Sequence, residues 1–279
     1  LMPSPRRDIS FRDRTVLVTG ASSGIGRETA LAFAAAGSNV ILVARGAKAL
    51  AEVATSVRKL GAKAMAIPTD VTKGPAVAAC FAKAARRFGA IDIVVNNAGV
   101  MIPSKVEDIR EADLRTMLDV NLFGALHVMQ QAVKVMRRQG HGHIVNVASL
   151  AGRRGFSPLG GYCATKFALV GMTEALRLEL GGEDIHVSLV MPAVVDTPLA
   201  TSAQRDAGVP IHWPERLNMP PSWVTQCIFL AIRFRLAEIA VPPGSALVEK
   251  LAALAPGTTD SVLRWAIGAA QRAASARGG

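Results

Sequence analysis

Hydrophobic and polar positions along the chain follow two alternating patterns. Short runs of β-branched and other apolar residues predict strands at Thr15–Thr19, Val40–Ala44, Lys63–Pro68, Ile91–Val95, His143–Ala148, Ile185–Met191 and Glu238–Val241. Longer stretches with helical spacing, such as Arg27–Ala36 and Ala47–Leu60, lie between them. This alternation indicates βαβ units, and right-handed crossovers then predict an α/β protein: a doubly wound parallel sheet (Rossmann fold) of about seven strands, with helices on both faces.

One main domain accounts for most of the 279 residues, since no repeat or linker divides the chain. We expect a flexible N-terminal arm over residues 1–13, the sheet domain over 14–244 and a helical extension over 245–279. Residues 198–222 are rich in proline and lack a strong period, which predicts a lid over a substrate. The extension is expected to pack on the body or on another subunit. Membrane association through this basic tail is the less favoured alternative.

Composition and charge narrow the range of functions. Aromatic residues make up only 5% of the chain, so small branched side chains must fill the core, as in parallel sheets. The net charge is +11, but the basic residues are scattered and no basic run has interleaved aromatics. A solvated basic surface is therefore favoured over nucleic-acid binding, and its field would help to attract an anionic cofactor.

Cysteine and histidine spacing argues against metal and disulfide chemistry. The three cysteines, Cys80, Cys163 and Cys227, are too few and too far apart for a disulfide framework, and no ligand spacing for a metal is present. The first residues are charged and lack the apolar region of a secretory signal, and no apolar run reaches membrane-spanning length. We therefore expect a cytoplasmic protein.

A glycine-rich turn follows the first predicted strand and leads into a helix. Gly20 permits the tight turn, Gly24 lets the backbone approach phosphates, and Gly26 lets helix and strand pack closely. Free N–H groups and the helix dipole then supply positive potential for a pyrophosphate. Its spacing, G-x-x-x-G-x-G, differs from the commoner dinucleotide fingerprint, and its place between strand and helix makes it a predicted dinucleotide site.

The residue after the second predicted strand bears on the choice of cofactor. In dinucleotide-binding folds this position meets the adenosine ribose, where an acid suits a free 2′-hydroxyl and an arginine suits a 2′-phosphate. Here Arg45 follows Ala44, and positions 43–45 contain no acid. The sequence therefore favours NADP(H), with an NAD(H)-dependent enzyme as the alternative.

Tyr162 and Lys166 are the main candidates for catalysis. They stand four residues apart on a predicted helix and so share one face. A free tyrosine has a pKa of about 10, and a nearby ammonium favours the phenolate, so we expect Lys166 to lower the pKa of Tyr162. The phenol can then exchange a proton with a substrate oxygen, which Ser149 can also hydrogen-bond. The hydride belongs to the cofactor.

Together these motifs resemble the short-chain dehydrogenase/reductase family. The resemblance covers roughly residues 14–200 and rests on Thr19-Gly20-x-x-x-Gly24-x-Gly26, Asn96-Asn97-Ala98-Gly99, Asn121, Ser149, Tyr162-x-x-x-Lys166 and Pro192 through Thr197. It implies an oxidoreductase that transfers a hydride between a nicotinamide and a carbonyl or alcohol carbon. It also implies a homodimer or homotetramer, with helices near 112–138 and 161–180 at one interface.

The resemblance also assigns roles to single residues. It implies a catalytic tetrad in which Asn121 anchors a water of a proton relay, Ser149 orients the substrate, Tyr162 is the acid/base and Lys166 holds the nicotinamide ribose. The implied cofactor contacts are Gly20, Ser22, Ser23, Gly24, Ile25, Gly26, Arg45, Asp70, Val71, Asn97, Ala98, Gly99, Tyr162, Lys166, Pro192, Ala193, Val195 and Thr197.

Two positions depart from the family pattern. Ala193 stands where the family usually has glycine, which we expect to stiffen or shift the turn under the nicotinamide. Ser23 stands where NADP(H)-preferring relatives often have a basic residue, so the cofactor prediction depends almost entirely on Arg45.

Apolar residues near the catalytic candidates predict the substrate pocket. Leu150, Phe156 and Leu159 lie between Ser149 and Tyr162, and the lid contributes His212 and Trp213. A bulky lipophilic ketone or secondary alcohol fits such a pocket, although an ordinary surface loop has the same composition. The rival from another class is a nucleotide-sensing binding protein without turnover, which would have no need of the tyrosine.

Overall fold

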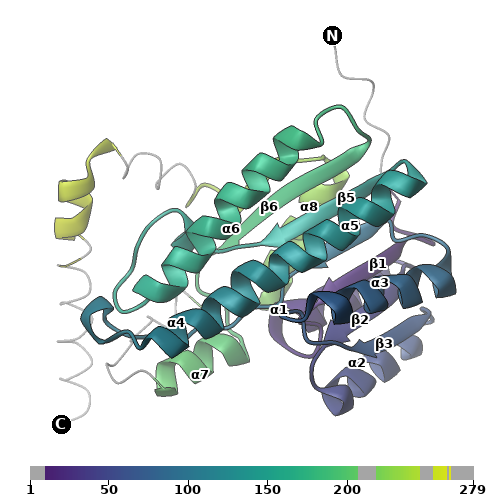
Figure 1. Cartoon of the computed structure of the whole chain (residues 1–279), viewed down its shortest axis with the longest axis horizontal. Coiled ribbons are helices and arrows are strands. Elements are labelled where there is room, and N and C mark those ends of the chain that lie inside the picture. Colours follow the sequence, from purple (N-terminus) through teal and green to yellow (C-terminus); the bar gives the residue numbers. More distant parts are fainter. Residues whose placement is uncertain (1–9, 207–217, 246–253, 263, 265–279) are drawn as a thin grey trace.

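Seven parallel strands form one sheet at the centre of the protein. The computed structural model describes residues 10–206, 218–245, 254–262 and 264. The strands pair in the order β3-β2-β1-β4-β5-β6-β7, every neighbouring pair is parallel, and the sheet runs through the middle of the view in Figure 1. The bounds are β1 Thr15–Thr19, β2 Asn39–Ala44, β3 Ala64–Pro68, β4 Ile93–Asn96, β5 Gly142–Val147, β6 Ile185–Pro192 and β7 Glu238–Val241. The predicted doubly wound sheet is confirmed.

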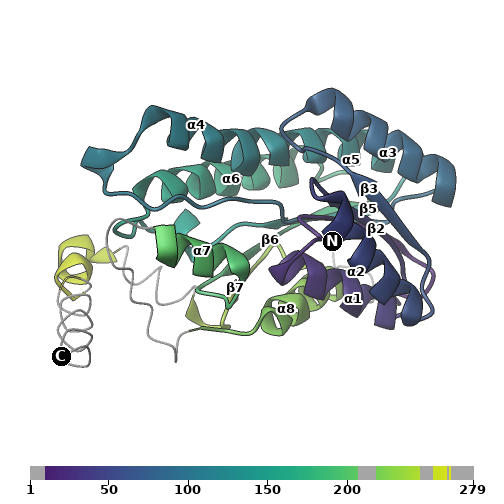
Figure 2. The same cartoon turned by 90° about the horizontal axis from the view of Figure 1, so that it is seen from below.

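Helices cover both faces of the sheet, as Figure 2 shows. One face carries α1 Gly24–Ala35, α2 Ala47–Lys59 and α8 Pro221–Arg233, and the other carries α3 Gly74–Phe88, α5 Ala125–Gln139 and α6 Gly160–Glu179. Successive residues of β1 point to opposite faces, so Leu17 packs under α3, α5 and α6, whereas Val16 and Val18 pack under α1, α2 and α8. Burial on both faces explains why the strands are apolar runs without polar alternation.

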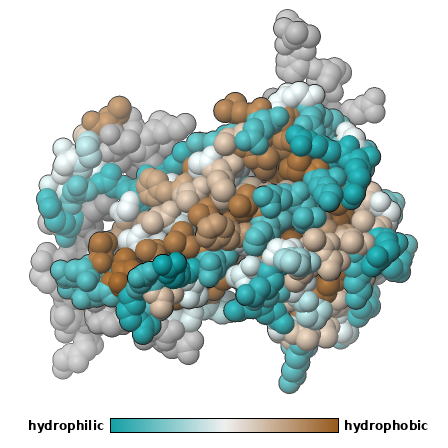
Figure 3. All heavy atoms as spheres, viewed as in Figure 1, coloured by the Kyte–Doolittle hydropathy of each residue, from teal (hydrophilic) through white to brown (hydrophobic). Residues whose placement is uncertain are grey.

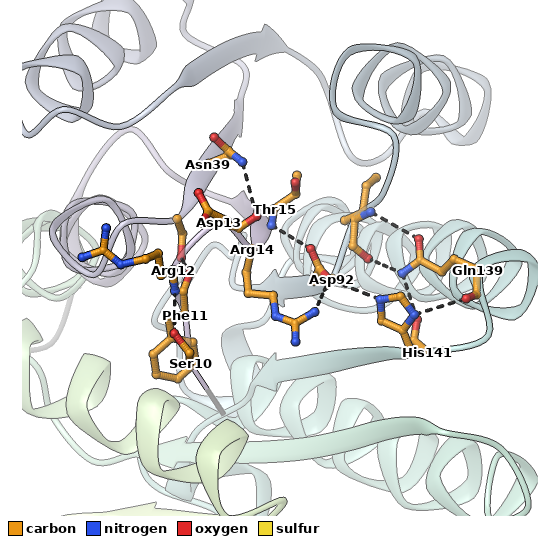
Figure 4. Close-up of polar contacts among 12 residues, drawn as sticks. Ser10, Phe11, Arg12, Asp13, Arg14, Thr15, Asn39, Asp92, Gln139 and His141 are labelled. Atoms are coloured by element: carbon orange, nitrogen blue, oxygen red, sulfur yellow. Dashed lines mark hydrogen bonds and ion pairs between the residues drawn. The ribbon is translucent and has the colours of Figure 1, made fainter. Parts of the chain in front are cut away.

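The fourth strand begins two residues later than the sequence predicts. The backbone of Ile91 is held by a side chain: Gln139 accepts from its N–H at 3.3 Å and donates to its carbonyl at 2.9 Å. Asp92 accepts hydrogen bonds from the Thr15 N–H, from Arg14 and from His141 (Figure 4). The strand itself runs from Ile93 to Asn96, although the Asp92 backbone already bonds to Thr15 and His143 on the two neighbouring strands.

Part of the predicted N-terminal arm is fixed to the body. Phe11 is 6% exposed, and its ring lies edge-on to Phe33 and Phe229 at centroid distances of 5.4 and 4.5 Å. The hydroxyl of Ser38 donates to the Phe11 carbonyl at 2.6 Å. Residues 10–13 therefore do not belong to a flexible arm, because burying one large ring outweighs the polar composition around it.

The predicted lid begins as a helix. Residues Pro198–Asp206 form α7, and the hydroxyl of Thr197 accepts a hydrogen bond from the Ala200 N–H at 3.4 Å, in the position of an N-cap. This start signal was missed because proline marks the first helical turn as readily as it marks a loop. The lid residues His212 and Trp213 lie outside the described residues.

Four shorter elements lie between β4 and α6 along the chain. They are η1 Val106–Asp108, α4 Glu111–Leu118, the π-helical turn η2 Asp119–Gly124 and η3 Leu150–Gly152. In the predicted extension, residues 256–262 are helical, and Asp260 forms an ion pair with Arg154. Within the described part of the chain, no helix combines the length and apolar character needed to cross a membrane.

Candidate active site

Two adjoining cavities lie at the carboxyl ends of the central strands, where α/β sheets bind ligands. The first, of about 390 Å³, is lined by the glycine turn and the ends of β2 and β3. The second, of about 300 Å³, is lined by the ends of β5 and β6 and the start of α6. They share a common wall of Ile25, Asn97, Gly99, Thr197 and Leu199, so together they form one trough. We call them the nucleotide cavity and the substrate cavity.

The glycine turn leaves no room for side chains. Gly20 and Gly24 have φ values of +65° and +51°, a region that glycine adopts readily. A Cβ on Gly24 would lie 3.0 Å from the Thr197 methyl group, across the trough. A Cβ on Gly26 would lie 2.3 Å from the Gly20 carbonyl oxygen, so this glycine allows helix and turn to pack, as predicted, without lining either cavity.

The start of α1 offers unoccupied N–H groups to the nucleotide cavity. Ser23 is the N-cap residue, its side chain makes no capping bond, and the first turn contains no acid. The first N–H groups of a helix have no partner within the helix and favour anions. Ser22, Ser23, Gly24 and Ile25 line the cavity here. The residues present therefore fit a pyrophosphate.

Thr19, which belongs to the glycine motif but was given no role from the sequence, also contributes to the site. Its hydroxyl oxygen accepts hydrogen bonds from the N–H groups of Asn97 and Ala98, at 2.9 and 3.0 Å. Both residues line the nucleotide cavity. Thr19 thus ties the end of β1 to the turn after β4, and its place directly before Gly20 was the available signal.

Charged groups gather at the far end of the nucleotide cavity. Arg45, Asp70 and Val71 line it together. Burial raises the pKa of Asp70, but hydrogen bonds from Thr72 and the charges of Arg45 and Lys73 outweigh this, and the net pKa is lowered. Asp70 is therefore ionised at neutral pH, and Arg45 is an exposed cation at the cavity rim.

Ser149, Tyr162 and Lys166 meet in the substrate cavity. Tyr162 and Lys166 come from the first turns of α6, and Ser149 follows β5. The Lys166 ammonium lies 5.7 Å from the centroid of the Tyr162 ring and donates to the Val147 carbonyl at 3.2 Å. The Ser149 hydroxyl donates to the Pro192 carbonyl at 3.3 Å and accepts from the Ala151 N–H at 3.1 Å.

The pKa of Tyr162 lies above its usual value, whereas the sequence led us to expect a lowered pKa. Burial raises the pKa of Tyr162, and a hydrogen bond with Ser149 offsets only part of the rise. Burial also lowers the pKa of Lys166 to about 8. The reason is desolvation, since each group disfavours its own charged form when water is removed. The phenol is therefore neutral at pH 7 and is a proton donor.

Asn121 is not among the residues that line either cavity. It is fully buried in η2, and its amide is held by three hydrogen bonds: it accepts from the Val100 N–H at 2.8 Å and donates to the Val100 carbonyl at 2.9 Å and to the Thr165 hydroxyl at 3.0 Å. Thr165 in turn donates to the Tyr162 carbonyl at 2.8 Å. Asn121 therefore joins the turn after β4 to the helix that carries the tyrosine, and π-helical turns of this kind are frequent at functional sites.

The rest of the substrate cavity is mostly apolar. Leu150, Phe156 and Leu159 line it, and Pro192, Ala193, Val195 and Thr197 line it from the β6 side. Further wall residues were not predicted from the sequence, namely Met101, Val147, Ala148, Ala151, Val194, Leu199 and Ala200. Several adjoin predicted residues directly, so adjacency along the chain was the only signal for them.

Comparison with known proteins agrees with this arrangement. Residues 14–208 match the sequence profile of the short chain dehydrogenase family. The chain belongs to the short-chain dehydrogenase family. It is 37% identical over 197 residues to a 3beta-hydroxysteroid dehydrogenase of Mediterraneibacter gnavus, an alignment covering 70% of this chain and 71% of the relative. It is 32% identical over 263 residues to the ketoacyl reductase HetN of a Nostoc species, covering 90% and 88%.

Solved structures of the family superpose closely. A short-chain dehydrogenase/reductase from Burkholderia phymatum in complex with NAD gives a TM-score of 0.79 at 28% identity, covering 87% of this chain and 94% of the other. A variant of the actinorhodin polyketide ketoreductase with NADPH gives a TM-score of 0.78 at 30% identity, covering 83% and 97%. Relatives with this fold thus carry either dinucleotide.

Proposed function

We propose that this short-chain dehydrogenase binds NADP(H) along the trough and transfers a hydride between the nicotinamide and a carbonyl or secondary alcohol carbon of a lipophilic substrate. One observation carries the proposal: a buried, neutral phenol stands at the junction between a glycine-lined anion site and an apolar cavity. A nucleotide-sensing protein would have no use for a proton donor at that junction.

The cofactor, when bound, supplies the hydride. The glycine turn and the start of α1 would hold its pyrophosphate, and Arg45, Asp70 and Val71 would surround its adenosine. Lys166, protonated below about pH 8, would hold the nicotinamide ribose through its ammonium. Ala193 and Thr197, on the β6 side, would lie along the nicotinamide.

The residues of the substrate cavity then act on the substrate oxygen. In the reduction direction Tyr162 donates its phenolic proton to that oxygen, and Ser149 hydrogen-bonds the same oxygen and orients it. Removal of water around the oxygen strengthens both interactions. Asn121 fixes the turn after β4 and, through Thr165, the backbone of Tyr162, and it would anchor the water that returns a proton to the phenol.

Arg45 supports NADP(H) over NAD(H). Its guanidinium lies at the cavity rim with no acid beside it in the chain, and guanidinium groups pair with phosphate through charge-assisted hydrogen bonds. The alternative, NAD(H), is favoured by Ser23, which contributes no positive charge to the cradle.

Wall composition supports a lipophilic substrate. The substrate cavity is lined by the hydrocarbon side chains of Met101, Phe156, Leu159 and Leu199. Ser149 and Tyr162 are the polar wall residues expected to face the substrate. The 3β-hydroxysteroid dehydrogenase among the relatives acts, by its name, on a substrate of this kind. Charged keto acids are expected to be poor substrates, since Lys166 is the cation among the described wall residues and the nicotinamide ribose would engage it.

Purified protein should oxidise NADPH when supplied with bulky apolar ketones. The assay follows the absorbance of the reduced nicotinamide across a panel of cyclic ketones, quinones and aldehydes, with short keto acids as matched polar controls. Oxidation of NADH alone would replace the cofactor assignment. Binding of a dinucleotide without turnover on any carbonyl or alcohol would instead favour a nucleotide-sensing protein.

The exposed face of α5 and α6 supports a homodimer or homotetramer. Apolar surface gathers over these helices in Figure 3, and a groove of about 590 Å³ between them is lined by Leu126, Met129, Val133, Met172 and Leu176 among others. Half-exposed Phe123 and Phe167 lie nearby on η2 and α6. Light scattering coupled to size exclusion should give a mass of two or four chains, and a monomer at micromolar concentration would contradict this proposal.

A further inference from the structure

His127 lies outside both cavities but touches the segment that forms the adenosine end of the nucleotide cavity. It is half-buried on the first turn of α5, and its Nδ1 lies 3.0 Å from the carbonyl oxygen of Val71. A carbonyl oxygen can only accept, so Nδ1 carries the proton and donates. The neutral ring is thereby fixed in one tautomer, with Nε2 free of hydrogen.

Two further contacts join the same two segments. A Cβ on Gly74 would lie 3.4 Å from the His127 ring, so the start of α3 rests directly on the imidazole. The side chain of Val71 packs on Gly124, where a Cβ would lie only 2.7 Å from a Val71 methyl group. Figure 2 shows α3 beside α5 on this face of the sheet. The loop 70–74 is thus held by three separate contacts with the end of η2 and the start of α5.

The loop fixed in this way presents Asp70 and Val71 to the nucleotide cavity. The Asp70 carboxylate accepts from the Thr72 N–H at 3.0 Å, so the whole turn moves as a unit with the Val71 backbone. His127, which is not among the residues that line either cavity, holds that backbone through its hydrogen bond to the Val71 carbonyl. We propose that His127 is a positioning residue that sets the adenosine end of the cofactor site through its hydrogen bond to Val71.

The same contacts also connect the loop 70–74 to the η2 turn that contains Asn121. Gly124 closes the η2 turn that contains Asn121, and α5 continues from it without a break. The loop 70–74 and the Asn121 amide are therefore seated on one rigid helical segment. His127 controls nucleotide affinity and leaves the proton chemistry at Tyr162 intact, because its described contacts are with the loop 70–74.

Three variants separate the hydrogen bond from the ring. His127→Leu removes the donor at similar volume, His127→Asn keeps an amide donor near the position of Nδ1, and His127→Gln moves the donor outward. Calorimetric titration with adenosine 2′,5′-bisphosphate and with NADPH measures the adenosine end without requiring turnover. We expect His127→Leu and His127→Gln to weaken both ligands by about fivefold to tenfold, because a buried acceptor loses its partner, and His127→Asn to stay within about twofold of the wild type.

Hydrogen–deuterium exchange of residues 70–77 in the ligand-free protein gives an independent readout. Faster exchange in His127→Leu than in His127→Asn is expected. If His127→Leu does not fold, His127→Gln takes its place in both measurements. Equal affinity and equal exchange in all variants would overturn the positioning role, and equal weakening in all three would assign the effect to the ring instead of the hydrogen bond.

This inference rests on the proposed nucleotide site, and the two fail in different ways. A wild-type protein that binds neither NADPH nor the bisphosphate overturns the proposed function. A wild type that binds both, with His127→Leu binding as tightly, overturns only the role of His127.

Discussion

The ammonium of Lys166 lies over the face of the Tyr162 ring, 5.7 Å from its centroid, and donates its hydrogen bond to the Val147 carbonyl. Both groups are buried, and burial raises the pKa of the phenol and lowers the pKa of the ammonium to about 8. Burial thus favours the neutral phenol, which is the form that the proposed proton donation by Tyr162 requires.

Tyr162→Phe should abolish turnover and leave cofactor binding intact. The variant keeps the ring, and with it the packing against Met117 and Leu159, but removes the proton. A loss of about 10²- to 10⁴-fold in kcat is expected for a missing general acid. NADPH affinity, measured by titration of protein fluorescence, should change by less than about twofold. Turnover close to that of the wild type would remove Tyr162 from the mechanism.

Arg45→Asp should reverse the cofactor preference. A guanidinium–phosphate contact is replaced by charge repulsion, so KM for NADPH should rise by about tenfold or more, while KM for NADH changes little. Arg86→Asp is the matched control, because it makes the same change of charge at an exposed position on α3 outside both cavities. If Arg45→Asp raises KM equally for NADPH and NADH, Arg45 does not determine the cofactor preference.

Stability should fall as the solution is acidified below pH 6.5. Burial, together with the charges of His186 and Arg235, lowers the pKa of His143 to about 3. In the unfolded chain His143 therefore binds a proton near pH 6.5, whereas in the folded protein it stays neutral until about pH 3. The free energy of unfolding should decrease through that window, by at most about 1.4 kcal/mol per pH unit from this group.

His143→Gln tests the source of that pH dependence. The Ser188 hydroxyl donates to the Leu236 carbonyl, so Nε2 of the ring donates to that hydroxyl at 2.8 Å, and the glutamine amide can replace this donor without titrating. Urea denaturation at pH 7, 6 and 5 should show a shallower loss of stability in the variant than in the wild type. Parallel slopes would assign the acid sensitivity to other groups.

Phe11→Ala should destabilise the whole domain. Phe11 is buried between Phe33 of α1 and Phe229 of α8, so its removal opens a cavity in the core on that face. A loss of about 3–5 kcal/mol in the free energy of unfolding is expected, measured by urea denaturation, against less than about 1.5 kcal/mol for the volume-conserving Phe11→Leu. A loss of less than about 1 kcal/mol in Phe11→Ala would mean that this segment contributes little to the fold.

Local patterns in the chain predicted much of the fold and the site. Strand positions followed from apolar runs that both faces of the sheet bury, and the glycine turn followed from residues such as Gly20, whose positive φ few other residues adopt. Tyr162 and Lys166 could be paired because helical periodicity places residues four apart on one face. Each of these signals acts over a few residues, so the sequence by itself determined them.

Contacts between distant segments were decided only by the tertiary structure. Gln139 binds the backbone of Ile91 ahead of β4, Phe11 packs against two helices, and His127 contacts Val71 across 56 positions of the chain. The protonation of Tyr162 also depends on the tertiary structure, because the spacing to Lys166 predicts a charge effect but not the desolvation that raises the pKa of the phenol. Burial is a property of the assembled core, and no local pattern states how much water a side chain will lose.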